Sequence, residues 1–407
     1  MEESVSKRFS KSSTSNAVGA NDANTAVALE CINCMCHSTE NLYRYRSTSI
    51  ARASDDFYPA RPESHTVHLV NVAYNSLFVG EICLPDWDMF HSKHKSSQLH
   101  AAARAIGGTP VYVSDKPGNH DIDLLKTLVL PDGSVLRADK PGRPTRDCLF
   151  ADVGRDGVSA LKVWNVNNHN SSVLSGAGGG VIGAFNVQGV AWNFDTNENE
   201  ILNTSPPDVT ASIKPYDINS LIRKEHDYYN DDGGPSSFAV WSHRTKSLQV
   251  LPTGDSSIET ILKPHEWEIY TIQPIQQHRG DSNTKIANIQ WAPIGLMNML
   301  NSGGALTNAG TFYEDTNVFD SDDVDTTASV NISCRGPGSF VAYCQPRPLQ
   351  IFIRNNIDQK YDDSSTRQLS TQQRELNFQY SNGMLEFNLP PESMEGTAHD
   401  LTVVWQQ

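Results

Sequence analysis

Four short apolar segments each end in polar residues that could take part in catalysis. The first, 31–37, reads Cys-Ile-Asn-Cys-Met-Cys-His, and the second, 48–56, ends in Ser-Asp-Asp. The third, 77–88, ends in Asp-Trp-Asp, and the fourth, 109–115, ends in Ser-Asp. Helical patterns follow three of them. In a parallel β/α barrel the C-terminal ends of the strands form the active face, so we expect these side chains to build the functional site.

Asp55 and Asp56 are candidates for a general acid and base. Two adjacent carboxylates repel each other, so the pKa of one of them is expected to rise. A carboxyl group with a raised pKa can protonate a leaving group and later accept a proton from the incoming nucleophile. The structural alternative is a solvated pair at a helix N-terminus, where the helix dipole favours acidic residues.

The triplet Asp86-Trp87-Asp88 is suited to binding a sugar. Its carboxylates can accept hydrogen bonds from neighbouring hydroxyls, and the indole face can pack against the C–H side of a pyranose ring. The structural alternative is a loop that exposes both acids and buries the Trp. Ser114 and Asp115 are candidates either for a pocket contact or for capping the helix that follows.

The cluster Cys31, Cys34, Cys36 and His37 suggests a zinc site, but the spacing argues against one. In a strand, Cys34 and Cys36 point to one face and Cys31 to the other. The sequence has no second Cys/His pair at the spacing of a zinc finger. We therefore expect no metal. The cysteines are either buried thiols of a barrel strand, or Cys34, Cys36 or His37 forms part of a pocket wall.

Composition places the chain among ordinary globular proteins. Its 407 residues are enough for two or three domains, and the net charge is -15 with 19% charged residues. An acidic surface is a poor partner for the phosphates of nucleic acid. No apolar run approaches the roughly 20 residues of a membrane helix, and the N-terminus has no hydrophobic signal core. We expect a cytoplasmic protein without a nucleic-acid or membrane partner, whose seven cysteines are reduced thiols.

The chain divides into three parts by texture. Residues 1–27 are rich in Ser, Asn and Ala, which predicts a disordered or frayed segment. In 28–150, apolar spacing predicts a helix around 67–77 and a second over 98–106 ending at Gly107-Gly108. A third helix is expected to be capped by Asn119, with Ile122, Leu125 and Leu128 or Val129 on its buried face. Strands that alternate with helices indicate parallel βα units.

The third part, 151–407, favours an antiparallel β-sandwich. Apolar runs with a period of two, such as 160–166 and 267–272, are separated by Gly- and Asn-rich turns and not by helices. The acidic tract 304–330 is predicted to be a long surface loop. The fold class expected is thus α/β plus β: the C-terminal half of a (β/α)8 barrel, followed by the sandwich.

Four βα units make only half of an eight-stranded barrel. An open half-barrel leaves its first strand unpaired on one side, which is costly. We therefore expect that the chain lacks an N-terminal part, or that its four strands pair with something else.

Several strings resemble the raffinose synthase and alkaline α-galactosidase (seed imbibition protein) branch of glycoside hydrolase family thirty-six. The most specific are Arg-Ala-Ser-Asp-Asp-Phe-Tyr-Pro at 52–59 and Pro-Asp-Trp-Asp-Met-Phe-His-Ser at 85–92. Tyr-Val-Ser-Asp-Lys-Pro-Gly at 112–118 and Gly-Arg-Pro-Thr-Arg-Asp-Cys-Leu-Phe at 142–150 come next, with weaker matches at 185–189 and 292–296. The likeness runs from about residue 28 to the C-terminus.

The resemblance implies a fold, a chemistry and a place for the acid. The fold is a β/α barrel between an N-terminal β-domain and a C-terminal β-sandwich. The chemistry is transfer or hydrolysis of α-galactosyl groups with retention, by two carboxylates. The nucleophile is an Asp on a Lys-Val-Asp strand, one βα unit before the strand that carries Cys34 and His37, and this sequence has no such string. The acid/base Asp lies within 52–59.

The resemblance leaves Asp55 and Asp56 open as the acid/base residue. The spacing of Arg, three residues and Asp in related α-galactosidases selects Asp56 with Arg52, and alignment on Ser-Asp in bacterial relatives selects Asp55. We favour Asp56.

We therefore expect the C-terminal portion of a galactinol–sucrose galactosyltransferase or α-galactosidase-like enzyme. Its expected partners are galactinol, sucrose or raffinose-family α-galactosides, with no cofactor and no metal. The alternative is a catalytically inactive carbohydrate-binding remnant that lacks the nucleophile. Beside the two aspartates, the candidate substrate contacts are Arg52, Asp86, Trp87, Asp88, Cys34, His37, Ser114 and Asp115.

Overall fold

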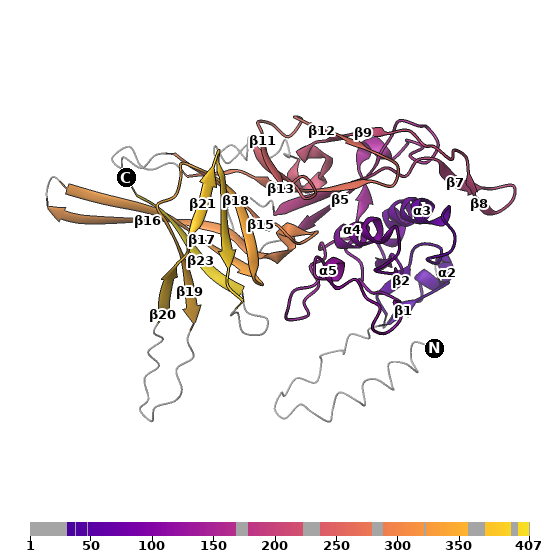
Figure 1. Cartoon of the computed structure of the whole chain (residues 1–407), viewed down its shortest axis with the longest axis horizontal. Helices are drawn as coiled ribbons and strands as arrows, with labels where there is room; N and C mark the ends of the chain where they lie inside the picture. The colour runs from indigo at the N-terminus through magenta and orange to yellow at the C-terminus, as the bar shows by residue number, and fades with distance from the viewer. Residues whose placement is uncertain are drawn as a thin grey trace, which may run out of the picture.

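The computed structural model describes residues 31–36, 38–46, 48–167, 178–222, 237–278, 288–320, 323–356, 371–391 and 398–406. The segment 1–27 and His37 lie outside these residues. Figure 1 shows a β/α part near the N-terminal end of the described chain, a large sheet beside it, and a separate group of strands towards the C-terminus. No helix in the described residues is long and apolar enough to cross a membrane.

The N-terminal part is a small parallel sheet flanked by helices, as the alternating pattern predicts. Its strand order is β1-β2-β3, and both strand pairs are parallel. The strands are β1 (Ile32–Asn33), β2 (Ile50–Arg52) and β3 (Leu84–Asp86); the helices are α2 (Thr39–Leu42), α3 (Ser64–Val79), α4 (Ser97–Gly107) and α5 (Ile122–Leu125). Within the described residues these strands do not close into a barrel.

The boundaries of α3 and α4 follow from local chemistry. The helix α4 ends as expected, because Gly108 takes a left-handed φ of 65° that a side chain would disfavour. The helix α3 extends to Val79, so the expectation that a strand begins at Leu77 is wrong; β3 begins only at Leu84. The apolar spacing of α3 continues through Leu77, and helical periodicity prevails there.

The fourth segment, 109–115, does not form the expected strand. Only one parallel bridge, between Phe90 and Val113, joins it to the chain after β3. Pro110 has no N–H to give to a ladder, which explains part of the shortfall. The following helix is also shorter than expected: Asp121 caps it instead of Asn119, and Ile122 is 53% exposed.

All strand pairs from β4 onward in the described chain are antiparallel, as predicted from the alternating runs. A six-stranded sheet has the order β11-β10-β13-β6-β5-β4. Its strands are β4 (Arg143–Pro144), β5 (Leu161–Asn167), β6 (Gly179–Phe185), β10 (Phe238–Ser242), β11 (Ser247–Leu251) and β13 (Trp267–Pro274). Two short pairs accompany it: β7 (Val190–Asn193) with β8 (Glu198–Ile201), and β9 (Val209–Ile213) with β12 (Ile258–Leu262).

The helix α4 packs against this six-stranded sheet, and the two share one core. Ile106 of the helix and Val163, Val181 and Ile269 of the sheet are all buried in that core. The approach is close at Gly183, where an added Cβ would lie 2.3 Å from the Cδ1 atom of Ile106. The six-stranded sheet therefore supports α4 through the side chain of Ile106.

The C-terminal strands form two five-stranded sheets around a second core that includes Trp291, Phe340 and Leu401. One sheet has the order β14-β15-β18-β22-β21 and the other β16-β17-β23-β19-β20. The strands are β14 (Gln276–His278), β15 (Ile289–Leu296), β16 (Leu306–Asp320), β17 (Asp323–Arg335), β18 (Gly338–Gln345), β19 (Gln350–Asn356), β20 (Thr371–Glu375), β21 (Phe378–Ser381), β22 (Met384–Leu389) and β23 (Ala398–Gln406).

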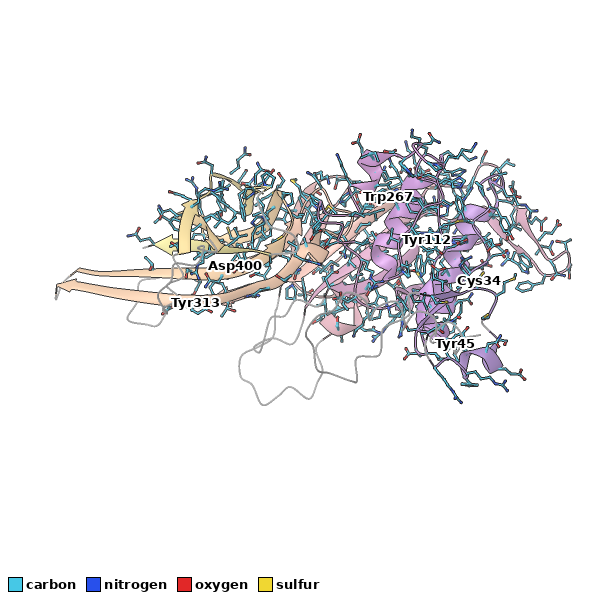
Figure 2. The ribbon with its side chains drawn as sticks, turned by 90° about the horizontal axis from the view of Figure 1, so that it is seen from below. Cys34, Tyr45, Tyr112, Trp267, Tyr313 and Asp400 are labelled. Carbon is cyan, nitrogen blue, oxygen red and sulfur yellow. The ribbon has the colours of Figure 1, made fainter. Side chains whose placement is uncertain are left out.

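The acidic tract 304–330 is a strand pair and not the predicted surface loop. It forms β16 and most of β17, which extend away from the rest of the molecule in Figures 1 and 2. Its acidic residues suggested a loop, but β16 pairs with β17 and β17 pairs with β23 along the tract.

Candidate active site

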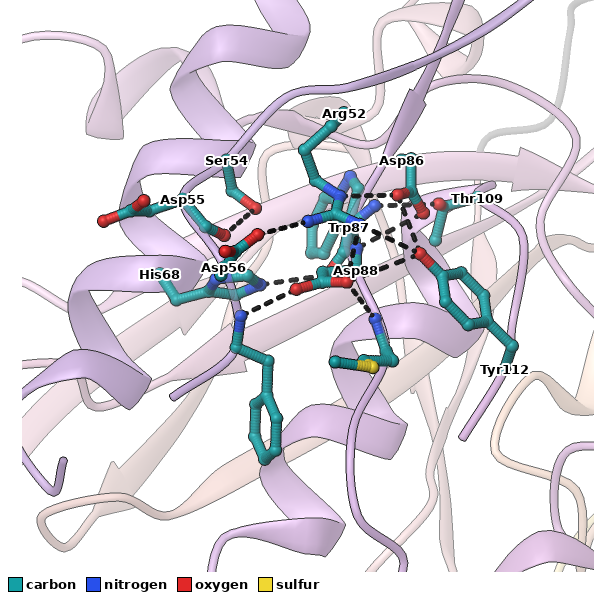
Figure 3. Close-up of polar contacts among 12 residues, drawn as sticks. Arg52, Ser54, Asp55, Asp56, His68, Asp86, Trp87, Asp88, Thr109 and Tyr112 are labelled. Carbon is teal, nitrogen blue, oxygen red and sulfur yellow. Dashed lines mark hydrogen bonds and ion pairs between the residues drawn. The ribbon is translucent and has the colours of Figure 1, made fainter. Parts of the chain in front are cut away.

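Arg52 is the centre of a cluster of charged side chains at the ends of β2 and β3 (Figure 3). Its Nε atom lies 2.7 Å from Oδ2 of Asp86, and its Nη2 atom lies 2.7 Å from Oδ1 of Asp88. Its Nη1 atom donates to Oδ1 of Asp56 at 3.0 Å. Nη2 also donates to the hydroxyl of Tyr112 at 3.4 Å. One guanidinium therefore holds three carboxylates and a phenol.

The parallel register of β2 and β3 brings the first pair together. Arg52 and Asp86 are direct neighbours across the two strands, each at the last residue of its strand. Because the carboxyl ends of parallel strands lie at the same edge, residues 34 positions apart meet there. The sequence expectation that these strand ends converge is thus confirmed for this pair.

Asp88 joins the loop after β2 to the loop after β3. Its Oδ2 atom accepts a hydrogen bond from the backbone N–H of Phe57 at 2.6 Å, and its Oδ1 atom accepts one from Met89 at 2.7 Å. Its φ is 62°, a left-handed conformation that is uncommon for a residue other than glycine. Asp88 is 1% exposed. A strained and buried carboxylate of this kind is held by its surroundings.

Tyr112 and Thr109 bring the fourth segment into the same site. The hydroxyl of Tyr112 donates to Oδ2 of Asp86 at 2.9 Å, and the backbone N–H of Trp87 donates to the hydroxyl oxygen of Thr109 at 3.1 Å. Although the segment forms no regular strand, it still closes the cluster on that side. Sequence reasoning selected Ser114 and Asp115 here and missed Tyr112, although Tyr112 lies within the family-like string.

Charge pairing and burial together determine the protonation states of Arg52 and Tyr112. Burial by itself would lower the pKa of Arg52, but the hydrogen bond to Asp86 and the charge of Asp88 raise it above its ordinary value. Burial and then the charge of Asp86 raise the pKa of the Tyr112 phenol. Arg52 is therefore a permanent cation and Tyr112 a permanent hydrogen-bond donor at neutral pH. The pairing satisfies carboxylates that would be costly to bury alone.

Asp55 and Asp56 have different surroundings although they are adjacent. The side chain of Asp56 is 61% exposed, and its carboxylate meets Arg52 at the solvent side of the cluster. The carboxylate of Asp55 is also exposed, but Figure 3 shows it pointing away from Arg52. Its charge is the main cause that raises the pKa of the nearby Tyr58. Of the pair, only Asp56 is part of the cluster.

The family is decided by comparison with known sequences. The model of raffinose synthase or seed imbibition protein Sip1 matches residues 7–371. The chain belongs to this family. It is 44% identical over 336 residues to a probable galactinol–sucrose galactosyltransferase 6 of Arabidopsis thaliana, covering 82% of this chain and 41% of that protein.

Two further relatives of the chain come from Pisum sativum. A galactinol–sucrose galactosyltransferase is 37% identical, over 78% of this chain and 37% of the relative. A stachyose synthase is 32% identical, over 74% of this chain and 33% of the relative. The chain therefore spans about two fifths or less of the length of these relatives.

In this chain, Trp87 lies in the core and not on the surface. It is 0% exposed, and an added Cβ on Gly107 of α4 would lie 3.0 Å from its ring. The indole packs against the helix, and its Nε1 atom has no hydrogen-bond partner. The expected stacking of Trp87 on a sugar ring stays a prediction, and it requires the loop to move from the conformation described.

Other predicted contacts lie apart from the cluster. Asp115 accepts a hydrogen bond from the backbone N–H of Ser92 at 2.8 Å and contacts His120 at 3.2 Å. Burial would raise the pKa of Asp115, but these bonds hold it below its ordinary value. Ser114 is exposed, and its N–H donates to the carbonyl of Phe90.

The cysteines near β1 show no sign of a metal centre. Cys34 is exposed at the end of β1, and its carbonyl accepts from the thiol of Cys36 at 3.1 Å. His37 lies outside the described residues. In the part of the chain that the structure describes, no three His, Cys, Asp or Glu side chains are grouped as metal ligands. All seven cysteines are free thiols.

Proposed function

We propose that this chain supplies the acid/base side of an active site that transfers α-galactosyl groups with retention, from galactinol to sucrose or to a raffinose-type oligosaccharide. The observation that carries the proposal is the exposed Asp56 carboxylate, which lies 3.0 Å from Arg52, a side chain held by the buried Asp86 and Asp88. Such a group has a defined position and free access to a ligand. Family membership supports galactosyl chemistry.

Asp56 acts twice in the proposed reaction. As a carboxylic acid it protonates the oxygen of the leaving group, while the galactosyl group passes to a nucleophile about 5 Å away. As a carboxylate it then accepts the proton of the incoming hydroxyl, from sucrose in transfer or from water in hydrolysis. Arg52 stabilises the carboxylate form after the proton has left.

The nucleophile is assigned to a part of the family's barrel that this sequence does not include, because it has no Lys-Val-Asp string. In the same proposal β1, β2, β3 and the segment 109–115 are the last four strands of a (β/α)8 barrel. The parallel pairing of β1, β2 and β3 and their order along the chain support this assignment. The edge of β1 opposite β2 would pair with the preceding barrel strand.

The test is made in the extended protein, which is this sequence joined to the rest of the length that its relatives have. Replacing Asp56→Ala should lower kcat on galactinol by about 10²–10⁴-fold, since galactinol has a poor leaving group. The loss on p-nitrophenyl α-galactoside should be smaller, because nitrophenolate leaves without a proton. Added azide should restore turnover of the aryl substrate and yield galactosyl azide.

Asp55→Ala is the matched control for this test. It removes an exposed neighbouring carboxylate and should keep both activities within tenfold. Wild-type turnover of galactinol by Asp56→Ala would refute the assignment, and the reverse result for the two variants would transfer the role to Asp55.

A catalytically inactive carbohydrate-binding protein is the second candidate, favoured by the absence of a Lys-Val-Asp string in the sequence. It predicts that galactosides bind without turnover and that no substitution at Asp56 changes this. The reading frame upstream of the coding sequence separates the two candidates at little cost. An in-frame Lys-Val-Asp strand supports the enzyme, and a stop codon supports the binding protein.

A further inference from the structure

Arg104 is a buried cation whose described partners are backbone carbonyls and histidine rings and not a carboxylate. It lies on α4 and is 0% exposed. Its Nη2 atom donates to the carbonyl of Trp87, and its Nε atom donates to the carbonyl of Asp88 at 3.2 Å. A weaker contact reaches the carbonyl of Met89 at 3.5 Å. In the described part of the chain no acidic side chain forms an ion pair with it.

Burying the guanidinium of Arg104 is unfavourable, so we expect its contacts to serve a role in the fold or in the site. Taking a guanidinium out of water costs several kcal/mol in a folded protein. The penalty is visible in the pKa of Arg104, which burial lowers to about 10. The charges of Asp88 and then Asp86 act in the opposite direction. Arg104 therefore remains charged at neutral pH and offsets part of the excess negative charge around Arg52.

Three of the carbonyls that Arg104 contacts belong to the turn that positions Asp88, residues 87–89. The backbone at Asp88 has the strained φ of 62°. Arg104 donates hydrogen bonds to the carbonyls of Trp87 and Asp88. The carboxylate of Asp88 contacts Arg52 and accepts a hydrogen bond from the N–H of Phe57. A chain of contacts thus leads from Arg104 through the backbone of 87–89 and Asp88 to Arg52.

Buried histidines fix the orientation of Arg104. The Nη1 atom of Arg104 lies 2.9 Å from Nδ1 of His100, which must therefore be the unprotonated acceptor. The Nε2–H group of His100 then donates to Nδ1 of His65 at 2.9 Å. Nε2 of His68 lies 2.9 Å from the carbonyl of Trp87 and supports the same turn. These histidines are neutral, because burial lowers their pKa values.

We propose that Arg104 is a positioning residue for the catalytic pair Arg52 and Asp56, acting through the backbone of 87–89 and the carboxylate of Asp88. The inference rests on the proposed function, since it takes Asp56 as the acid/base group. Arg104 touches no substrate. It holds the turn in the conformation in which Asp88 shares Arg52 with Asp56.

The test is a double-mutant cycle in the extended protein. Arg104→Met keeps the length and the apolar stem but removes every hydrogen bond. It should lower kcat on galactinol by about 10–100-fold with an unchanged KM, and lower kcat on p-nitrophenyl α-galactoside by less. In an Asp56→Ala background the same change should cost less than threefold, because the group that Arg104 positions is already gone.

Two controls keep the result interpretable. Arg155→Met removes a half-exposed arginine of a surface pair and should change neither activity. Arg104→Lys keeps the charge but cannot reach several carbonyls at once, so it should lie between wild type and Arg104→Met. It is the variant to use if Arg104→Met does not fold, and failure of both to fold would make Arg104 a purely structural residue and overturn the inference.

The outcomes separate this inference from the proposed function. If Asp56→Ala keeps full galactinol turnover, the proposed function fails, whatever Arg104→Met does. If Asp56→Ala is inactive as proposed while Arg104→Met is fully active, or its loss multiplies with that of Asp56→Ala, only the positioning role of Arg104 is refuted.

Discussion

Two ionic clusters in this chain are built on a buried cation and differ in how fully their exposed carboxylate is bonded. Lys162 on β5 is 3% exposed, and its Nζ atom lies 2.8 Å from Asp147, 2.9 Å from Asp217 and 2.6 Å from the carbonyl of Ser212. Its three N–H donors therefore have three acceptors. Each cluster has one exposed carboxylate, 57% exposed for Asp147 and 61% for Asp56. Asp147 uses both oxygens, one on Lys162 and the other on the hydroxyl of Thr145 at 2.6 Å, whereas the contacts described for Asp56 use Oδ1 alone.

The difference separates a structural cluster from a site that is ready for a ligand. Lys162 connects parts of the chain that lie 50 and 55 positions apart, and its ammonium has no donor left for anything else. Around Arg52 the inner acids are saturated, and the outer acid keeps a free face towards solvent. Pairing without an open position stabilises a fold, whereas pairing with one can position a reactive group.

The largest effect is expected from Arg52→Met. Turnover of galactinol by the extended protein should fall by about 10³-fold, and turnover of the aryl galactoside by less, since the pair with Asp56 is lost. The free energy of unfolding should drop by about 3–5 kcal/mol, because Asp86 and Asp88 would stay buried without their cation. Urea unfolding measures the second effect. Adding Asp86→Asn and Asp88→Asn should recover much of the stability and none of the activity; recovered activity would show that Arg52 is only structural.

A pH dependence should come from the histidines that support the site. Burial lowers the pKa of His65 to about 4 and that of His68 to about 3, from an ordinary value of 6.5. The unfolded chain then binds more protons, so stability is complete above about pH 6.5 and is lost as the pH falls towards these values. Unfolding at pH 7 and pH 5 should differ by about 2 kcal/mol for each such group.

The variant His65→Leu tests this assignment. The loss of stability between pH 7 and pH 5 should become smaller by about one histidine's share. An unchanged pH slope in His65→Leu would mean that other groups cause it.

Lys162→Met is expected to affect stability alone. The free energy of unfolding should fall by about 1–3 kcal/mol, a reduced figure because Asp147 is half-exposed and can return to water. The ratio of activities on galactinol and on the aryl galactoside should not move, as measured in the extended protein at 15 °C. A changed ratio would break the comparison between the two clusters.

The smallest effect is expected for Asp55→Asn, within tenfold of wild type on both substrates. The carboxylate of Asp55 points away from Arg52, so its removal leaves the cluster unchanged. Steady-state kinetics measures this directly. A loss as large as that of Asp56→Ala would contradict this prediction and would mean that Asp55 also takes part in the reaction.

Much of this arrangement was predictable from local patterns. The parallel β/α part, the antiparallel strands and the end of α4 at Gly108 follow from periodicity and from turn chemistry. The convergence of Arg52 with Asp86 follows from the rule that parallel strand ends share an edge. The strand expected at 109–115 does not form, in part because Pro110 has no N–H for a ladder. The loop expected at 304–330 is a strand pair, because tertiary pairing overrode local composition there.

Arg104 had a signal in the sequence that was not used. It is a charged residue within the Ala-rich run of α4, where each neighbour is buried. A lone arginine on such a face needs partners, but sequence spacing cannot name backbone carbonyls as those partners. Tyr112 was missed for a similar reason, since only the folded loop brings its hydroxyl to Asp86.

The amino-acid order by itself determined which residue types end the strands, and with them the family and its sugar chemistry. The tertiary structure decided which of those residues are free to react. Asp86, Trp87 and Asp88 are buried, Asp55 points away, and Asp56 alone joins exposure to a fixed partner. The physical reason is that solvent access and charge pairing depend on what other segments cover, and those segments are distant in the chain.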